Sequence, residues 1–67
     1  MSDPKYPDIE VELSGRDGNA FMIIGRVMRA LRFGNVPQSE IDAFRLEASS
    51  GSYDHVLQTV MKWVSAS

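Results

Sequence analysis

Residues 8–13 read DIEVEL, a segment in which acidic and apolar side chains alternate one by one. Successive side chains of a β-strand point to opposite faces, so the alternation predicts a strand with Ile9, Val11 and Leu13 on one face and carboxylates on the other. Most of the remaining chain is patterned as helix. A single strand leaves its backbone donors and acceptors unpaired, so the fold has to supply a mate for it.

Three mates are open: the tail of the same chain, a second copy of the chain, or the sheet edge of another protein. If residues 63–66 are extended, they can lie beside residues 9–13 and close the sheet within the chain. We favour this pairing, which predicts an α+β fold with one N-terminal strand, three helices and a short C-terminal strand. Residues 1–7 contain two prolines and are predicted to form an extended N-terminal arm, with residues 8–67 as a single small domain.

Apolar residues at three- and four-residue spacing predict three helices. The first spans residues 20–33, and its predicted inward stripe is Phe21, Ile24, Val27, Met28 and Leu31. The second runs from Pro37 to about Ala48, with Ile41, Phe44 and either Leu46 or Ala48 inward. The third follows an N-cap at Ser52, and its predicted stripe is Tyr53, Val56, Leu57, Val60, Met61 and Trp63.

Two glycines bear on the first helix. Gly34 follows its last residue and is predicted as the C′ position, with Asn35 alongside. Gly25 lies in the helix interior, where glycine is about 1 kcal/mol less favourable than alanine. We therefore expect a close backbone neighbour at Gly25.

Composition limits the class of protein. The chain has 67 residues, no cysteine, a net charge of −2 and 43% hydrophobic residues, which is typical of one globular domain without disulfides. Its longest apolar run, Ala20 to Ile24, is far too short to span a bilayer, and MSDPKYPD is unlike a signal peptide. We expect a cytoplasmic protein without membrane contact. Because the chain lacks a basic surplus, we do not expect it to bind nucleic acid directly.

No motif specifies a reaction. His55 is the sole histidine and adjoins Asp54, but neighbouring residues on a helix point about 100° apart, so this carboxylate cannot orient the ring as in a catalytic triad. Residues 14–19, SGRDGN, match neither glycine-rich phosphate-binding pattern and are predicted to form a structural turn. We predict no catalytic residue, cofactor or metal, and we interpret His55 as a surface or partner-facing residue.

Acidic residues provide the leading candidate for a binding surface. A negative surface can fill a positively charged channel on another protein, although a polar exterior would show the same residues. The predicted partner-binding residues are Asp8, Glu10, Glu12, Asp17, Glu47, Asp54 and His55.

Arg26, Arg29 and Arg32 recur every third residue and form a basic arc on the first helix. This arc supports an alternative hypothesis, a small dimeric regulator that binds nucleic acid. The same arginines can equally be solvated or pair with the strand carboxylates. We favour a monomer and leave a homodimer open.

Four pieces of the sequence carry a resemblance: DGNAF at residues 17–21, EASSG at 47–51, YDH at 53–55 and WV at 63–64. With them, the chain resembles a set of short proteins encoded in bacterial and phage accessory genomes. The resemblance implies a small autonomous domain from a mobile element. In size, lack of cysteine and mobile-element setting it also looks like an anti-CRISPR protein, which implies a non-catalytic inhibitor that blocks DNA binding by a Cas subunit.

Overall fold

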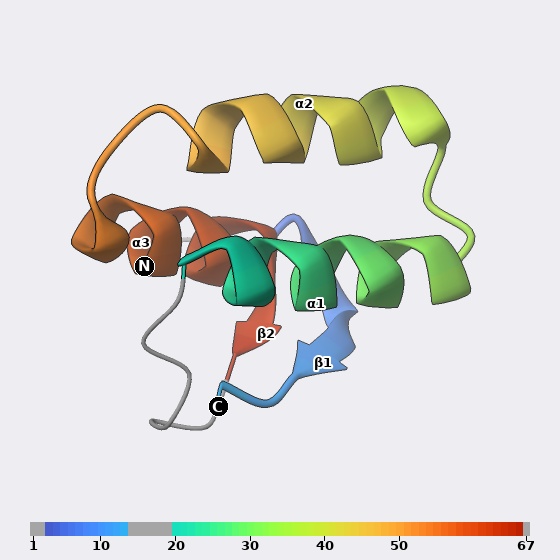
Figure 1. The fold of residues 1–67 in the computed structure, drawn as a ribbon. Coiled ribbons are helices and arrows are strands. Elements are labelled where there is room, and N and C mark those ends of the chain that lie inside the picture. The colour runs from blue at the N-terminus through green and yellow to red at the C-terminus, as the bar shows by residue number, and fades with distance from the viewer. Residues whose placement is uncertain (1–2, 14–19, 67) are drawn as a thin grey trace.

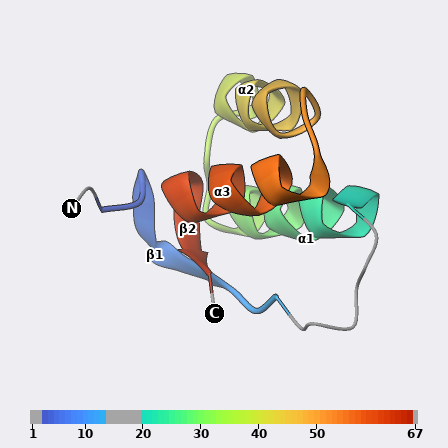
Figure 2. The ribbon, with the colours of Figure 1, turned by 90° about the vertical axis from the view of Figure 1, so that its left-hand side faces the viewer.

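The computed structural model describes residues 3–13 and 20–66 and shows the predicted α+β fold (Figure 1). In chain order its elements are β1 (Tyr6–Val11), α1 (Ala20–Phe33), α2 (Gln38–Ala48), α3 (Tyr53–Trp63) and β2 (Val64–Ala66). Helices α1 and α3 form a middle layer, with α2 on one side and the two strands on the other (Figures 1 and 2). None of the helices in these two stretches is long and apolar enough to cross a membrane.

The mate of β1 is β2, which confirms the predicted pairing within the chain. The two strands are parallel, and their register is irregular between Tyr6 and Glu10. The paired residues are Tyr6 with Val64, Glu10 with Ser65, and Val11 with Ala66. All three helices lie between the two strands in sequence, so the sheet joins the first and last elements of the domain.

Part of the predicted N-terminal arm belongs to this sheet. Strand β1 begins at Tyr6, two residues before the predicted start. The backbone N–H of Lys5 donates to the carbonyl of Lys62 at 2.9 Å, and the Ser65 hydroxyl donates to the carbonyl of Pro7 at 2.8 Å. A proline lacks an N–H group but keeps its acceptor, so Pro7 is tolerated in a two-stranded sheet.

The hydrophobic core fills the space between the three layers and draws on every element. Its buried apolar residues are Val11, Ile23, Ile24, Val27, Leu31, Val36, Ile41, Phe44, Ala48, Val56, Val60, Trp63 and Val64. Ile9 and Leu13 pack against this core and are partly buried. The predicted inward face of the strand is therefore confirmed.

The buried stripes of α1 and α3 differ from the predicted ones. On α1, Ile23 is buried, whereas Phe21 is 81% exposed. On α3, Thr59 is buried, while Tyr53 and Met61 are exposed. Each helix has more apolar residues than one face can bury, so the spacing fits more than one rotation about the helix axis. Tertiary packing selects the rotation.

Asn35, and not Gly34, takes the left-handed conformation at the end of α1, with φ of 62°. The N–H of Val36 bonds to the carbonyl of Leu31 at 3.0 Å, and the N–H of Asn35 bonds to the carbonyl of Arg32 at 3.0 Å. These bonds form a Schellman motif with Asn35 at C′. The predicted position of the motif was wrong by one residue because asparagine also tolerates this conformation.

Candidate functional site

The outer face of β1 carries the acidic side chains that the alternation predicts. Asp8 and Glu10, and Glu12 just after the strand, are exposed, whereas Val11 is buried and Ile9 is partly buried. We call the three exposed carboxylates the acidic face. Ile9 and Val11 beneath them pack against the core and hold this segment in place.

The acidic face is not neutralised by cations in the part of the chain that the structure describes. Its three carboxylates form no ion pair there. Nη1 of Arg26 donates to the backbone carbonyl of Glu12 at 3.0 Å. The acidic face is therefore available to a positively charged partner.

Two other residues of the predicted surface have contacts within the chain. Nε1 of Trp63 donates to Oε2 of Glu47 at 2.7 Å. Nε2 of the partly buried His55 lies 2.8 Å from the backbone carbonyl of Glu47. These contacts tie the last turn of α2 to α3, which is a structural role for both residues.

The structure does not bring the predicted residues together on one surface. Asp54 is exposed in the first turn of α3, next to His55, and so belongs to the α2–α3 connection and not to the strand. Asp17 lies outside the described residues. In residues 3–13 and 20–66, no group of three histidine, aspartate or glutamate side chains is placed to hold a metal ion.

A cluster that the sequence analysis missed holds the start of β1 against α2 and α3. The Lys5 ammonium forms an ion pair with Glu40 and lies 4.5 Å from the centroid of the Trp63 ring. The Tyr6 hydroxyl donates to Oε1 of Glu40 at 3.0 Å, and its ring stacks on Trp63 with 6.0 Å between centroids. We call Lys5, Tyr6, Glu40 and Trp63 the Lys5 clasp. No local pattern reveals it, because its members are far apart in sequence.

The clasp shifts the titration of its members. The hydrogen bond from Lys5, followed by that from Tyr6, lowers the pKa of Glu40 below its ordinary value. The same bond to Glu40 raises the pKa of Lys5. Desolvation, followed by the hydrogen bond to Glu40, raises the pKa of Tyr6. Each pKa shift favours the state in which Lys5 and Tyr6 are protonated and bonded to an ionised Glu40. We therefore interpret the Lys5 clasp as a structural contact that holds β1 in place.

Arg29 and Arg32 of the basic arc are exposed on α1. They line a hollow of about 230 Å³ together with Gly25 and Met28. Arg26 is also exposed and reaches back to the strand segment through Glu12. The three arginines therefore do not act as one uniform surface.

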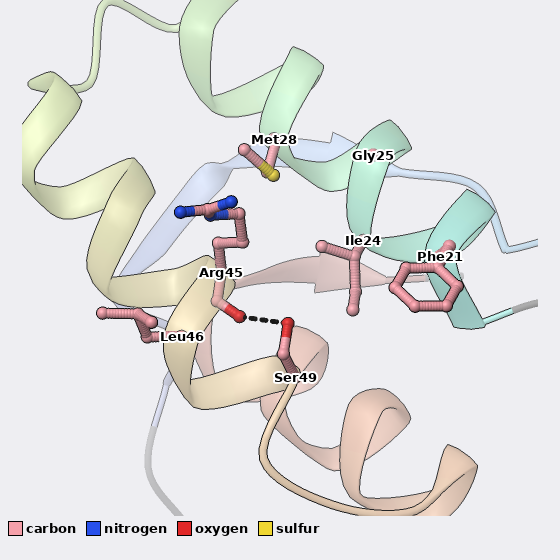
Figure 3. A pocket seen from close by; sticks show the side chains of 7 residues that line it. All are labelled: Phe21, Ile24, Gly25, Met28, Arg45, Leu46 and Ser49. Carbon is pink, nitrogen blue, oxygen red and sulfur yellow. Dashed lines mark hydrogen bonds between the residues drawn. The ribbon is translucent and has the colours of Figure 1, made fainter.

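A larger hollow lies between α1 and the end of α2 (Figure 3). Its volume is about 400 Å³, and its lining residues are Phe21, Ile24, Gly25, Met28, Arg45, Leu46 and Ser49. Gly25 is exposed there, and a Cβ added to it would meet no atom within 4 Å. The expected close backbone neighbour of Gly25 was wrong for this chain, because α2 packs beside the glycine and leaves open space over it.

Comparisons of the chain with protein-family models, with curated proteins and with solved structures gave no match.

Proposed function

We propose that this chain is a non-catalytic protein-binding module that contacts a positively charged partner through the acidic face of β1. One observation supports this proposal most directly. Asp8 and Glu10 of β1 and Glu12 just after it are all exposed, and the other side of this segment is anchored in the core. Because the backbone beneath these carboxylates is already anchored, binding requires no ordering of the strand itself.

In the most concrete form of this proposal, the partner is a Cas effector subunit and the chain is an anti-CRISPR inhibitor. The row of carboxylates would take the place of DNA phosphates in a basic channel of the effector. The small size and the absence of cysteine support this form. Such an effector acts in the cytoplasm, the compartment that the cysteine-free sequence predicts.

The experiment measures binding of target DNA by a purified Cas effector complex, with and without the chain. We expect the chain to reduce DNA binding, and we expect Glu10→Lys to weaken this inhibition about tenfold or more by placing a like charge against the basic channel. The matched control is Asp42→Lys, which makes the same charge change at an exposed position of α2. The anti-CRISPR form fails if the chain and the effector do not associate at low salt.

The same proteins test the alternative, nucleic-acid-binding hypothesis. A gel shift with duplex DNA at low salt should show no retardation by the chain alone. The alternative would be supported if the chain did retard DNA, if Arg29→Glu abolished this retardation and if Glu10→Lys did not weaken it. That result would contradict our proposal.

A further inference from the structure

The groove between α1 and α2 is an exposed apolar surface that the proposed function does not use. Figure 3 shows Phe21, Ile24 and Met28 of α1 on one side and Leu46 of α2 on the other. Phe21 is 81% exposed and Leu46 is 68% exposed, so large apolar side chains stand at its rims. A concave surface with apolar walls of this kind is typical of a binding site.

Gly25 is a second, independent indication that the groove is a binding site. A glycine in a helix interior destabilises the fold, and here no atom outside the neighbouring backbone of α1 lies within 4 Å to use the space of the missing side chain. Gly25 lines both the hollow beside Leu46 and the adjoining hollow beside Arg32. A glycine at this point lets an outside chain approach the α1 backbone closely, which a larger residue would prevent.

The charges around the groove define the chemistry of its occupant. Arg45 lines the larger hollow, and its guanidinium extends toward Met28 (Figure 3). Arg29 and Arg32 line the adjoining hollow. No aspartate or glutamate is among the described residues that line either one. The groove is thus apolar along its floor and basic at its edge, so it complements apolar side chains flanked by carboxylates.

A second copy of this chain is not a suitable occupant of the groove. A symmetric contact through the groove would bring the arginines of both copies together, and like charges facing each other disfavour association. The acidic face cannot enter the groove of another copy as an amphipathic segment either. Its intervening apolar residues, Ile9 and Val11, are turned into the core.

We propose that the α1–α2 groove binds an acidic amphipathic helix of another protein. The apolar side chains of that helix pack over Gly25 between Phe21 and Leu46, and its carboxylates meet Arg29, Arg32 and Arg45. A third hollow of about 250 Å³ extends the same surface past Phe21 to Gly51 and Val56. The trough therefore follows α1 for several turns, as recognition of a helix in a groove requires.

The test is a selection from two libraries of helical peptides of about four turns, with apolar anchors at positions i, i+3, i+4 and i+7. One library carries Asp and Glu on its flanks, and the other carries Lys and Arg. We expect binders from the acidic library only. Titration of the labelled protein with an enriched peptide should shift the NMR signals of Gly25 and Met28 and leave those of Asp8 and Glu10 unchanged.

Two substitutions decide whether the groove is the site. Gly25→Leu fills the hollow and should weaken the enriched peptide about tenfold or more, since an anchor side chain then has no room. Arg29→Glu should weaken it as well, whereas Lys62→Glu, the same charge change at an exposed position of α3, should not. Gly25→Ala serves as the folding control, because it should raise the urea midpoint while still weakening the peptide.

Three outcomes overturn this proposal: no enrichment from the acidic library, equal enrichment from the basic library, or binding that Gly25→Leu leaves unchanged. Binding of duplex DNA that depends on Arg29 and is insensitive to Gly25→Leu would assign the surface to nucleic acid instead. None of these results depends on the acidic face, so the groove and the proposed function can fail separately.

Discussion

Cδ1 of Ile9 on β1 lies 2.7 Å from the point that a Cβ of Gly34 would occupy, and Cγ1 of Ile9 lies 3.1 Å from it. The backbone at Gly34 does not have a positive φ, so its conformation is open to other residues. An added Cβ at Gly34 would therefore require the Ile9 side chain to move.

We expect Gly34→Ala to lower the free energy of unfolding by about 1–3 kcal/mol through overpacking against Ile9. Urea denaturation followed by circular dichroism measures this change. Ile9→Val removes Cδ1, so Gly34→Ala should be less destabilising in that background. Strict additivity of the two substitutions would contradict the packing described here.

The hydrogen bond from Trp63 to Glu47 should contribute about 1 kcal/mol to stability, because it joins two helices through a buried indole. Trp63→Phe removes the donor and part of the ring. A double-mutant cycle with Glu47→Ala separates the two effects, since only the hydrogen bond depends on both residues. A coupling free energy near zero in urea denaturation would show that this bond does not stabilise the fold.

The Lys5 clasp predicts a pH dependence of stability. The pKa of Glu40 is lowered from its ordinary value of 4.5, so its contribution is present above that pH and is lost as the pH falls through the lowered pKa. The natural chain should therefore be more stable than Glu40→Gln at neutral pH, and the difference should shrink below pH 4.5. Urea denaturation over a series of pH values measures it.

Asp42→Asn is the matched control for this pH experiment, since it neutralises an exposed carboxylate on the same helix and leaves the clasp intact. If the difference between the natural chain and Glu40→Gln stays constant through the acidic range, the clasp is not an ionic interaction in solution.

Replacing Asn35 with glycine should preserve the stability of the fold, whereas replacing it with alanine should lower it. Its φ of 62° costs a residue with a Cβ about 1–2 kcal/mol, a cost that asparagine partly offsets through local hydrogen bonding. We expect Asn35→Ala to destabilise the chain by about 1 kcal/mol and Asn35→Gly to leave it nearly unchanged. Thermal unfolding compares the three proteins, and equal melting temperatures for alanine and asparagine would contradict the Schellman ending of α1.

The sequence was sufficient to predict features that depend on neighbouring residues. The alternation around Val11 predicted the strand and its inward face, and Ser52 predicted the start of α3, where its hydroxyl accepts the N–H of His55 at 3.4 Å. An unpaired strand needs a mate, which left three mates open, and the tail that we favoured is the one that the structure shows. These inferences rest on local periodicity and on hydrogen-bond accounting.

Features set by tertiary contact could not be predicted in the same way. The exposure of Phe21 depends on how α1 is rotated against its neighbours, and the open space over Gly25 depends on how α2 packs beside it. The Lys5 clasp brings together residues from the start of β1, from α2 and from the end of α3. Nothing in the spacing of Lys5, Glu40 and Trp63 along the chain indicates that they meet.

The parallel pairing of β1 with β2 also affects the order of folding. All three helices lie in the loop that this pairing closes, and the entropy of closing a long loop has to be overcome before strand contacts stabilise the chain. We therefore expect slower folding than in a purely helical domain of this length. During synthesis the sheet cannot form until Val64–Ala66 has left the ribosome. Only then does a partner strand hold the segment that carries the acidic face.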